Sequence, residues 1–231
     1  MLCGFCFFAA AALASGPVSA AGAASPSVPW GLSGPAIPSG PRAAFESPCP
    51  GSDGPCITVS DGTTGAVLKR LPATSLDGRV HARAAELHAV PERRSIVAAF
   101  AGLPELWEIS LDPAAPPVFD GLVHDHRMGE GIGRPGYLAP RRTQLARPLV
   151  ALAIDAASGW VIARERAAEA GPGETAPPQV VLLHLDIRRA VARWPAAPGV
   201  DTAAATPAVR EGRRGFAVPA EGRTLWFEPP R

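Results

Sequence analysis

The sequence lacks the short motifs by which several enzyme classes are recognised. It contains no Gly-x-Ser-x-Gly elbow, no phosphate-binding loop and no zinc-protease motif. These absences remove the signatures of the serine hydrolases of that type, the P-loop nucleotide hydrolases and the zincins. The sequence therefore assigns no catalytic residue and no metal site.

Lysine is nearly absent. Lys69 is the only lysine, and the other cationic residues are arginines. The net charge is +1, so charge alone indicates no nucleic acid or other polyanion as a partner. Long apolar runs are also missing from the mature part of the chain, where no segment approaches the ~18 residues of a membrane-spanning helix. We expect no membrane span and a soluble mature protein.

The N-terminal segment has the features of a secretory signal. Leu2–Ala14 is an apolar run too short to cross a bilayer, and Val18–Ala20 supplies the small residues of a cleavage site. No lysine or arginine precedes the run. We interpret residues 1–20 as a signal peptide and expect export to the periplasm.

Cysteine is scarce, with four in the whole chain. Cys3 and Cys6 fall in the expected signal peptide, whereas Cys49 and Cys56 lie in a loop rich in Pro, Gly and Ser. In an oxidising compartment this pair favours a small disulfide over two free thiols. A metal site would need more ligands nearby.

What is present is a series of short β-prone runs separated by turns. Proline and glycine make residues 21–56 look like a flexible lead-in, and the pattern changes at Ile57. We expect one all-β domain over residues 57–231. Its expected strands are Ile57–Val59, Ala66–Leu68, Ala84–Val90, Ser95–Phe100, Leu106–Ser110, Leu149–Ile154, Trp160–Ala163, Gln179–Leu185, Ala190–Trp194, Ala208–Val209, Gly215–Val218 and Thr224–Phe227.

The runs recur as meanders, which favours the blades of a β-propeller. At ~40–50 residues a blade, the mature chain holds about three to four. It is then either a minimal ring or an arc of an incomplete one, whose exposed edges invite another chain. A helical alternative at Ala82–Leu87 and Arg164–Ala170 is weak, because neither stretch sustains an apolar stripe at helical period.

Several stretches are more distinctive than the periodicity. They are Glu105–Pro113, Phe119–Glu130, Pro135–Leu138, Pro140–Thr143, Gln179–Val181 and Leu185–Arg189. They resemble the d1-haem β-propellers, which are cytochrome cd1 nitrite reductase and its relatives in d1-haem biosynthesis. The resemblance covers about residues 57–220. It implies an eight-bladed relative that holds d1 haem in its central channel with a histidine on the iron, reduces nitrite to nitric oxide, and receives electrons from a c-type haem domain.

This chain departs from the family at three points. It has no Cys-x-x-Cys-His motif for covalent haem attachment. Gly199 and Ala220 stand where the resemblance implies histidines, and neither residue ligates iron. Nitrite-reductase ancestry therefore does not imply that the chain is itself an enzyme, and we do not expect independent nitrite reductase activity.

The resemblance also supplies the candidate cofactor-binding residues, for d1 haem as the cofactor. His124 and His126 flank Asp125 in a long Gly-rich connection, where an imidazole next to a carboxylate orients a ligand or moves a proton. The d1 macrocycle bears carboxylates, which guanidinium groups bind in a bidentate manner. The candidates are His124, His126, Arg127, Arg141 and Arg142, and the alternative is a solvated, Arg-rich surface.

The remaining histidines and tryptophans have simpler explanations. His88 and His184 lie on expected strands, and we interpret them as ordinary surface or packed residues. Four tryptophans recur near strand ends, where packing between blades accounts for them. These are Trp107, Trp160, Trp194 and Trp226.

Three functional hypotheses follow. The leading one is an exported d1-haem-type propeller segment that binds or handles a tetrapyrrole in nitrite reduction or denitrification, with a ring-completing chain, a second copy of itself or a c-type cytochrome as partner. The second is a non-catalytic interaction protein that keeps the scaffold without haem. The third is a truncated product of a longer gene of this family, which would expose apolar blade faces.

Overall fold

The structure, a computed structural model, describes residues 40–119, 133–166 and 177–230. These residues form four antiparallel sheets of three or four strands and contain no α-helix. Sheets 1 and 2 are built from β1 (Arg42–Glu46), β2 (Cys56–Ser60), β3 (Val67–Pro72), β4 (Ala84–Val90), β5 (Ser95–Ala101), β6 (Glu105–Ser110) and β7 (Pro140–Gln144). Sheets 3 and 4 are built from β8 (Leu149–Asp155), β9 (Trp160–Glu165), β10 (Gln179–His184), β11 (Arg189–Pro195), β12 (Thr206–Arg210), β13 (Arg213–Ala220) and β14 (Arg223–Phe227).

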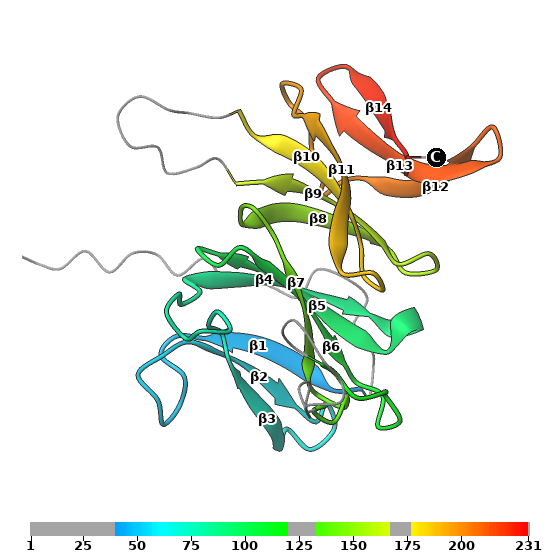
Figure 1. The fold of residues 1–231 in the computed structure, drawn as a ribbon. Coiled ribbons are helices and arrows are strands. Elements are labelled where there is room, and N and C mark those ends of the chain that lie inside the picture. Colours follow the sequence, from blue (N-terminus) through cyan, green and yellow to red (C-terminus); the bar gives the residue numbers. More distant parts are fainter. Residues whose placement is uncertain (1–39, 120–132, 167–176, 231) are drawn as a thin grey trace, which may run out of the picture.

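Every sheet is a meander in which sequential strands are neighbours. The four sheets follow one another in chain order, from the blue sheet 1 to the red sheet 4 (Figure 1). Sheets 2 and 3 have the four strands of a propeller blade, and sheets 1 and 4 have three strands in the same meander order. The fold class expected from the sequence, an all-β arc of propeller-like blades, is confirmed.

Three apolar clusters lie in the spaces between consecutive sheets, and the central strands contribute to the clusters on both of their faces. In β5, Ile96 and Phe100 belong to the cluster between sheets 1 and 2, while Val97 and Ala99 belong to the cluster between sheets 2 and 3. Successive side chains of a strand point to opposite faces. A strand buried on both faces therefore has a continuous apolar sequence, which is why β5 is easy to recognise from the sequence.

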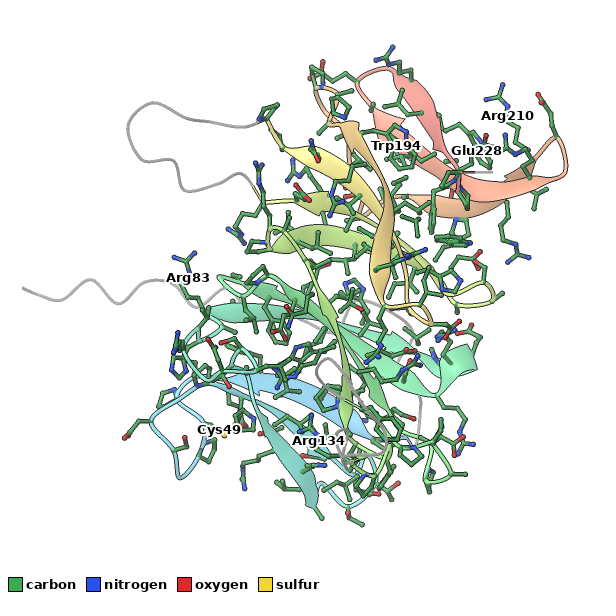
Figure 2. The ribbon with its side chains drawn as sticks, in the orientation of Figure 1. Cys49, Arg83, Arg134, Trp194, Arg210 and Glu228 are labelled. Carbon is green, nitrogen blue, oxygen red and sulfur yellow. A yellow bond between two sulfur atoms is a disulfide. The ribbon has the colours of Figure 1, made fainter. Side chains whose placement is uncertain are left out.

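The third cluster joins sheets 3 and 4, where the rings of Trp194 and Phe227 meet edge to face with centroids 5.0 Å apart. Figure 2 shows Trp194 at this junction. Trp107 likewise packs on Phe100 between sheets 1 and 2, with centroids 4.7 Å apart. Such pairs contribute about 0.5–1.5 kcal/mol beyond their buried area. These tryptophans act in packing between sheets.

The first strands of sheets 2, 3 and 4 take part in the contacts between neighbouring sheets. Strand β8 contacts both β5 and β12, and β4 contacts β1. We call β4, β8 and β12 the inner strands, because in a meander blade the first strand lies closest to the shared axis. The candidate site described below lies along them.

Two strands were not expected from the sequence. Residues 42–46, which we placed in the flexible lead-in, form β1 and pair with β2, so the ordered fold begins before Ile57. Pro140–Gln144, expected as a connection, forms β7 at the outer edge of sheet 2. Proline is tolerated there because an edge strand does not need every N–H in the ladder. The described segments contain no helix long and apolar enough to cross a membrane.

The outward face of sheet 4, away from sheet 3, differs from the three packed faces. Cross-strand pairing places Ala217 of β13 opposite Thr206 and Trp226, and side chains of paired residues share a face. Trp226 donates a hydrogen bond from Nε1 to Glu228, which also pairs with Arg213. Polar and small side chains therefore cover this end of the arc.

Candidate functional site

The inner strand of sheet 2 carries a histidine–carboxylate pair. Glu86 and His88 are two residues apart on β4, so their side chains lie on the same face of the strand. His88 Nε2 lies 2.8 Å from Glu86 Oε1. The two side chains are only 10% and 19% exposed, so the pair is largely removed from water.

Strand β8 reaches this pair through a bulge. The β8–β9 register shifts between Val150 and Ala153, and Ala151 has a φ of 56°, which is unusual for a residue other than glycine. In this conformation the N–H groups of Ala151 and Leu152 donate to the Glu86 carboxylate at 3.1 and 3.4 Å. The bulge therefore ties the inner strands of sheets 2 and 3 together at Glu86.

The surroundings of Glu86 lower its pKa. Burial is the largest single influence and raises the pKa. The hydrogen bond and charge of His88, together with the N–H groups of Leu152 and Ala151, outweigh burial, so the pKa lies below the ordinary value. Glu86 is therefore an anion held by three donors, and its role towards His88 is to fix the ring through Nε2.

Two cavities lie along the inner strands, one on either side of this pair. The cavity on the Glu86 side has a volume of about 320 Å³ and includes Arg166. The cavity on the His88 side has a volume of about 430 Å³ and includes Asp155 and Pro207, so it touches sheets 2, 3 and 4. Both volumes fall in the lower part of the ~300–1,000 Å³ range of small-molecule sites.

The predicted arginines are not on a loop. Arg141 and Arg142 are neighbours on β7, so they point to opposite faces of sheet 2. Arg142 stacks on Trp107 with its Cζ 4.2 Å from the ring centroid and donates to the Thr74 carbonyl at 2.7 Å. It also pairs with Glu105 at 3.3 Å. These contacts occupy Arg142 between sheets 1 and 2, where it serves packing.

Arg141 belongs to an ion-pair network between sheets 2 and 3. Arg93 donates to Glu108 at 2.8 Å and to Asp186 at 2.6 Å, and Arg141 binds Glu108 at 3.3 Å. The hydrogen bond from Arg93 is the main influence on the pKa of Asp186, which it lowers together with the charges of Arg93, His184 and Arg141, against burial. The network joins sheets 2 and 3 at the end where the turn after β4 and the β10–β11 turn lie.

His124, His126 and Arg127 lie outside the residues that the structure describes. Gly199 follows the end of β11 remote from the β10–β11 turn, whereas Arg141 donates to a carbonyl in that turn. Gly199 and Arg141 therefore lie in different parts of the fold.

Gly199 has no room for an imidazole. Its φ is +66°, and a Cβ there would lie 2.3 Å from Glu221 Cγ. Ala220, the other position at which the resemblance implies a histidine, is the last residue of β13. Neither position provides an iron ligand.

Cys49 and Cys56 are joined by a disulfide, with Cα atoms 5.3 Å apart. Glu46 lies close to both sulfur atoms and accepts a hydrogen bond from the Thr58 hydroxyl. A bonded disulfide does not offer the thiolates that a metal requires. We therefore assign this cluster to closing the first hairpin of sheet 1.

The sequence analysis missed the residues that the structure brings together. It treated His88 as ordinary, although a glutamate two positions earlier on a strand was a signal that the two share a face. The donors from the bulge could not be expected, since Ala151 is 65 residues away from Glu86. Arg166 carries no local signal at all.

Comparison with known proteins supports the fold and gives no information on the site. No family model and no curated protein matches the chain. Among solved structures, the chain is similar to dihydro-heme d1 dehydrogenase NirN in complex with DHE, with a TM-score of 0.50 and 19% sequence identity. The alignment covers 71% of this chain and 29% of that chain. At this identity the likeness concerns the fold, so the chain has a propeller-like arc similar to part of a d1-haem-related propeller.

Proposed function

We propose that this protein is an exported, d1-haem-type propeller arc that binds or handles a tetrapyrrole and has no nitrite reductase activity of its own. The observation that supports it best is His88, held by Glu86 and lining a cavity on the inner strands. At about 430 Å³ this cavity would take only one edge of a tetrapyrrole, and the rest of the group would lie outside it. The resemblance of the segments around residues 95–145 and the likeness in fold point to the same ligand class.

His88 is the residue of this chain that would hold the metal of such a group. Nε2 of His88 is engaged by Glu86, which leaves Nδ1 as the ring nitrogen for a metal, and haem iron takes histidine as its protein ligand. A carboxylate on the far nitrogen of a ligating histidine fixes its tautomer and raises its basicity. Bound iron would supply the redox chemistry, and the chain's own residues would hold and orient the group.

The absent histidines limit the proposal. Gly199 and Ala220 supply no ligand, and no covalent c-type haem motif is present to admit electrons. We therefore propose binding, storage or transfer of the tetrapyrrole in a denitrification context. The expected signal peptide and the periplasmic location belong to this proposal, as do a c-type cytochrome or a ring-completing chain as partner.

The test is a titration of the purified chain with d1 haem, followed by visible spectroscopy and gel filtration. We expect a shift of the Soret band and co-elution of pigment, both lost in His88→Ala and retained in His81→Ala, since His81 is an exposed histidine in the connection between β3 and β4. No shift and no co-elution with the unmodified chain would end the tetrapyrrole proposal.

A second function, a non-catalytic interaction protein, is favoured by the loss of both family histidine positions. The same titration separates the two, since this alternative expects a stable, folded chain whose spectrum d1 haem does not change.

A further inference from the structure

The cavity on the Glu86 side is almost entirely apolar. It lies between the beginning of β4 and the end of β5 in sheet 2 and the beginning of β8 in sheet 3, close to the loop after β11. Small side chains line it and leave the space open. The apolar lining consists of Ala84, Ala85, Ala99, Phe100, Ala101, Leu149, Val150, Ala151 and Ala203.

Two charged side chains enter this space, and only one of them is satisfied. The Glu86 carboxylate is held by His88 and by the N–H groups of Ala151 and Leu152. Arg166 follows β9 directly, and its Nε is buried with no hydrogen-bond partner among the described residues. Arg166 itself lines the cavity, so its guanidinium is the one cation among the described lining residues that an anion in this space can approach.

We propose that this cavity is a binding site for an apolar monocarboxylate, with the carboxylate on the Arg166 guanidinium and the apolar body among the alanines. Arginine presents a fork of N–H donors that matches a carboxylate, and its charge persists at every relevant pH. The ligand's apolar end lies towards Glu86, whose negative charge is offset by its three donors. The proposal does not rest on the tetrapyrrole function.

The volume sets the size of the ligand. About 320 Å³ accommodates on the order of ten heavy atoms at ~30 Å³ each. Octanoate, with eight carbons and two oxygens, matches this number. A short carboxylate such as acetate leaves most of the apolar wall without contact and binds weakly.

The experiment is isothermal titration calorimetry of the purified chain, free of any tetrapyrrole, with octanoate and with its neutral analogue 1-octanol. Arg166→Gln removes the charge, and Arg166→Lys keeps it. Arg164→Gln is the matched control, because Arg164 is exposed near the end of β9, two residues before Arg166, and the substitution changes the net charge equally. Tryptophan fluorescence and urea midpoints confirm that each variant is folded.

We expect octanoate to bind and Arg166→Gln to weaken its binding about tenfold or more, since hydrogen bonds to charged groups are worth about 1.5–3 kcal/mol. Arg166→Lys should weaken binding less than Arg166→Gln does. Arg164→Gln should leave the affinity within about twofold of that of the unmodified chain. Ala101→Leu, which fills the cavity from β5, should weaken octanoate binding with Arg166 intact. No binding by octanoate, equal binding by octanol, or equal losses in the Arg166→Gln and Arg164→Gln variants would each overturn the proposal. Failure of the d1-haem titration would leave it standing.

Discussion

The carboxylate of Glu86 joins the inner strands of sheets 2 and 3, so its removal should loosen the arc at its centre. Glu86→Ala takes away the acceptor of the Ala151 and Leu152 N–H groups and of His88. A buried donor left without a partner costs about 1–3 kcal/mol. The Glu86 side chain is 19% exposed, which lets water reach one of the three donors. We therefore expect a loss of about 2–4 kcal/mol in the free energy of unfolding.

The assay is urea unfolding at pH 7, followed by tryptophan fluorescence. Glu92→Ala is the control, because Glu92 is exposed in the β4–β5 turn, six residues along the chain. We expect its free energy of unfolding to stay within about 0.5 kcal/mol of that of the unmodified protein, as for most surface substitutions. Equal losses in the two variants would refute the central role of Glu86.

The pH dependence tests the same reasoning with a sign. The pKa of Glu86 is lower in the folded than in the unfolded chain, where it is ~4.3. Its ionised form therefore stabilises the fold fully above the unfolded pKa, and this contribution is lost as the pH falls through the folded pKa. Glu86→Gln imitates the protonated carboxyl, so its deficit should shrink between pH 7 and pH 3. A deficit that stays constant or grows would contradict the electrostatic part of the argument.

Three further outcomes are expected. Gly215→Ala should lower the free energy of unfolding by about 1–3 kcal/mol, because a Cβ there would lie 2.5 Å from the Phe227 carbonyl oxygen and 2.7 Å from Trp226 Cζ2; an unchanged free energy of unfolding in a urea titration would contradict this close packing. The double substitution Cys49→Ser and Cys56→Ser should lower the free energy of unfolding by about 2.5 kcal/mol for so short a loop. A reductant should shift the urea midpoint of the unmodified chain and leave that of the double variant unchanged. Sedimentation equilibrium should show a monomer of 23.8 kDa or its processed form, and a concentration-dependent dimer would contradict the polar character assigned to the outer face of sheet 4.

How much the sequence could predict depended on burial. Ser95–Phe100 and Gln179–Leu185 were recognisable because strands packed on both faces read as apolar runs between turns. Arg42–Glu46 and Pro140–Gln144 were not, since each lies at the edge of a sheet and contains charged residues. Their strand conformation comes from pairing with a neighbour, which no local pattern records.

The candidate site was less predictable for a related reason. Arg141 and Arg142 had the right chemistry for carboxylates, but sheets 2 and 3 use them for Glu108 and Glu105. An arginine is available to a ligand only where the fold gives it no acid, and that depends on contacts far apart in the sequence. Among the described residues no acid is paired with Arg166, whose Nε is buried without a partner, and the sequence around it carried no signal.

The end of the arc bears on the question of a ring-completing partner. Between sheets, the packed faces consist of side chains such as Ile162, Leu182 and Phe216. On the outward face of sheet 4, Trp226 lies against Gly215 of its own sheet and is held by Glu228. The sheet thus covers part of its own surface, in the way that terminal repeats of stacked proteins present a polar outer side. A further blade docked here would have to displace the indole and desolvate the pair of Glu228 with its arginine, which weakens the case for a ring closed at this end.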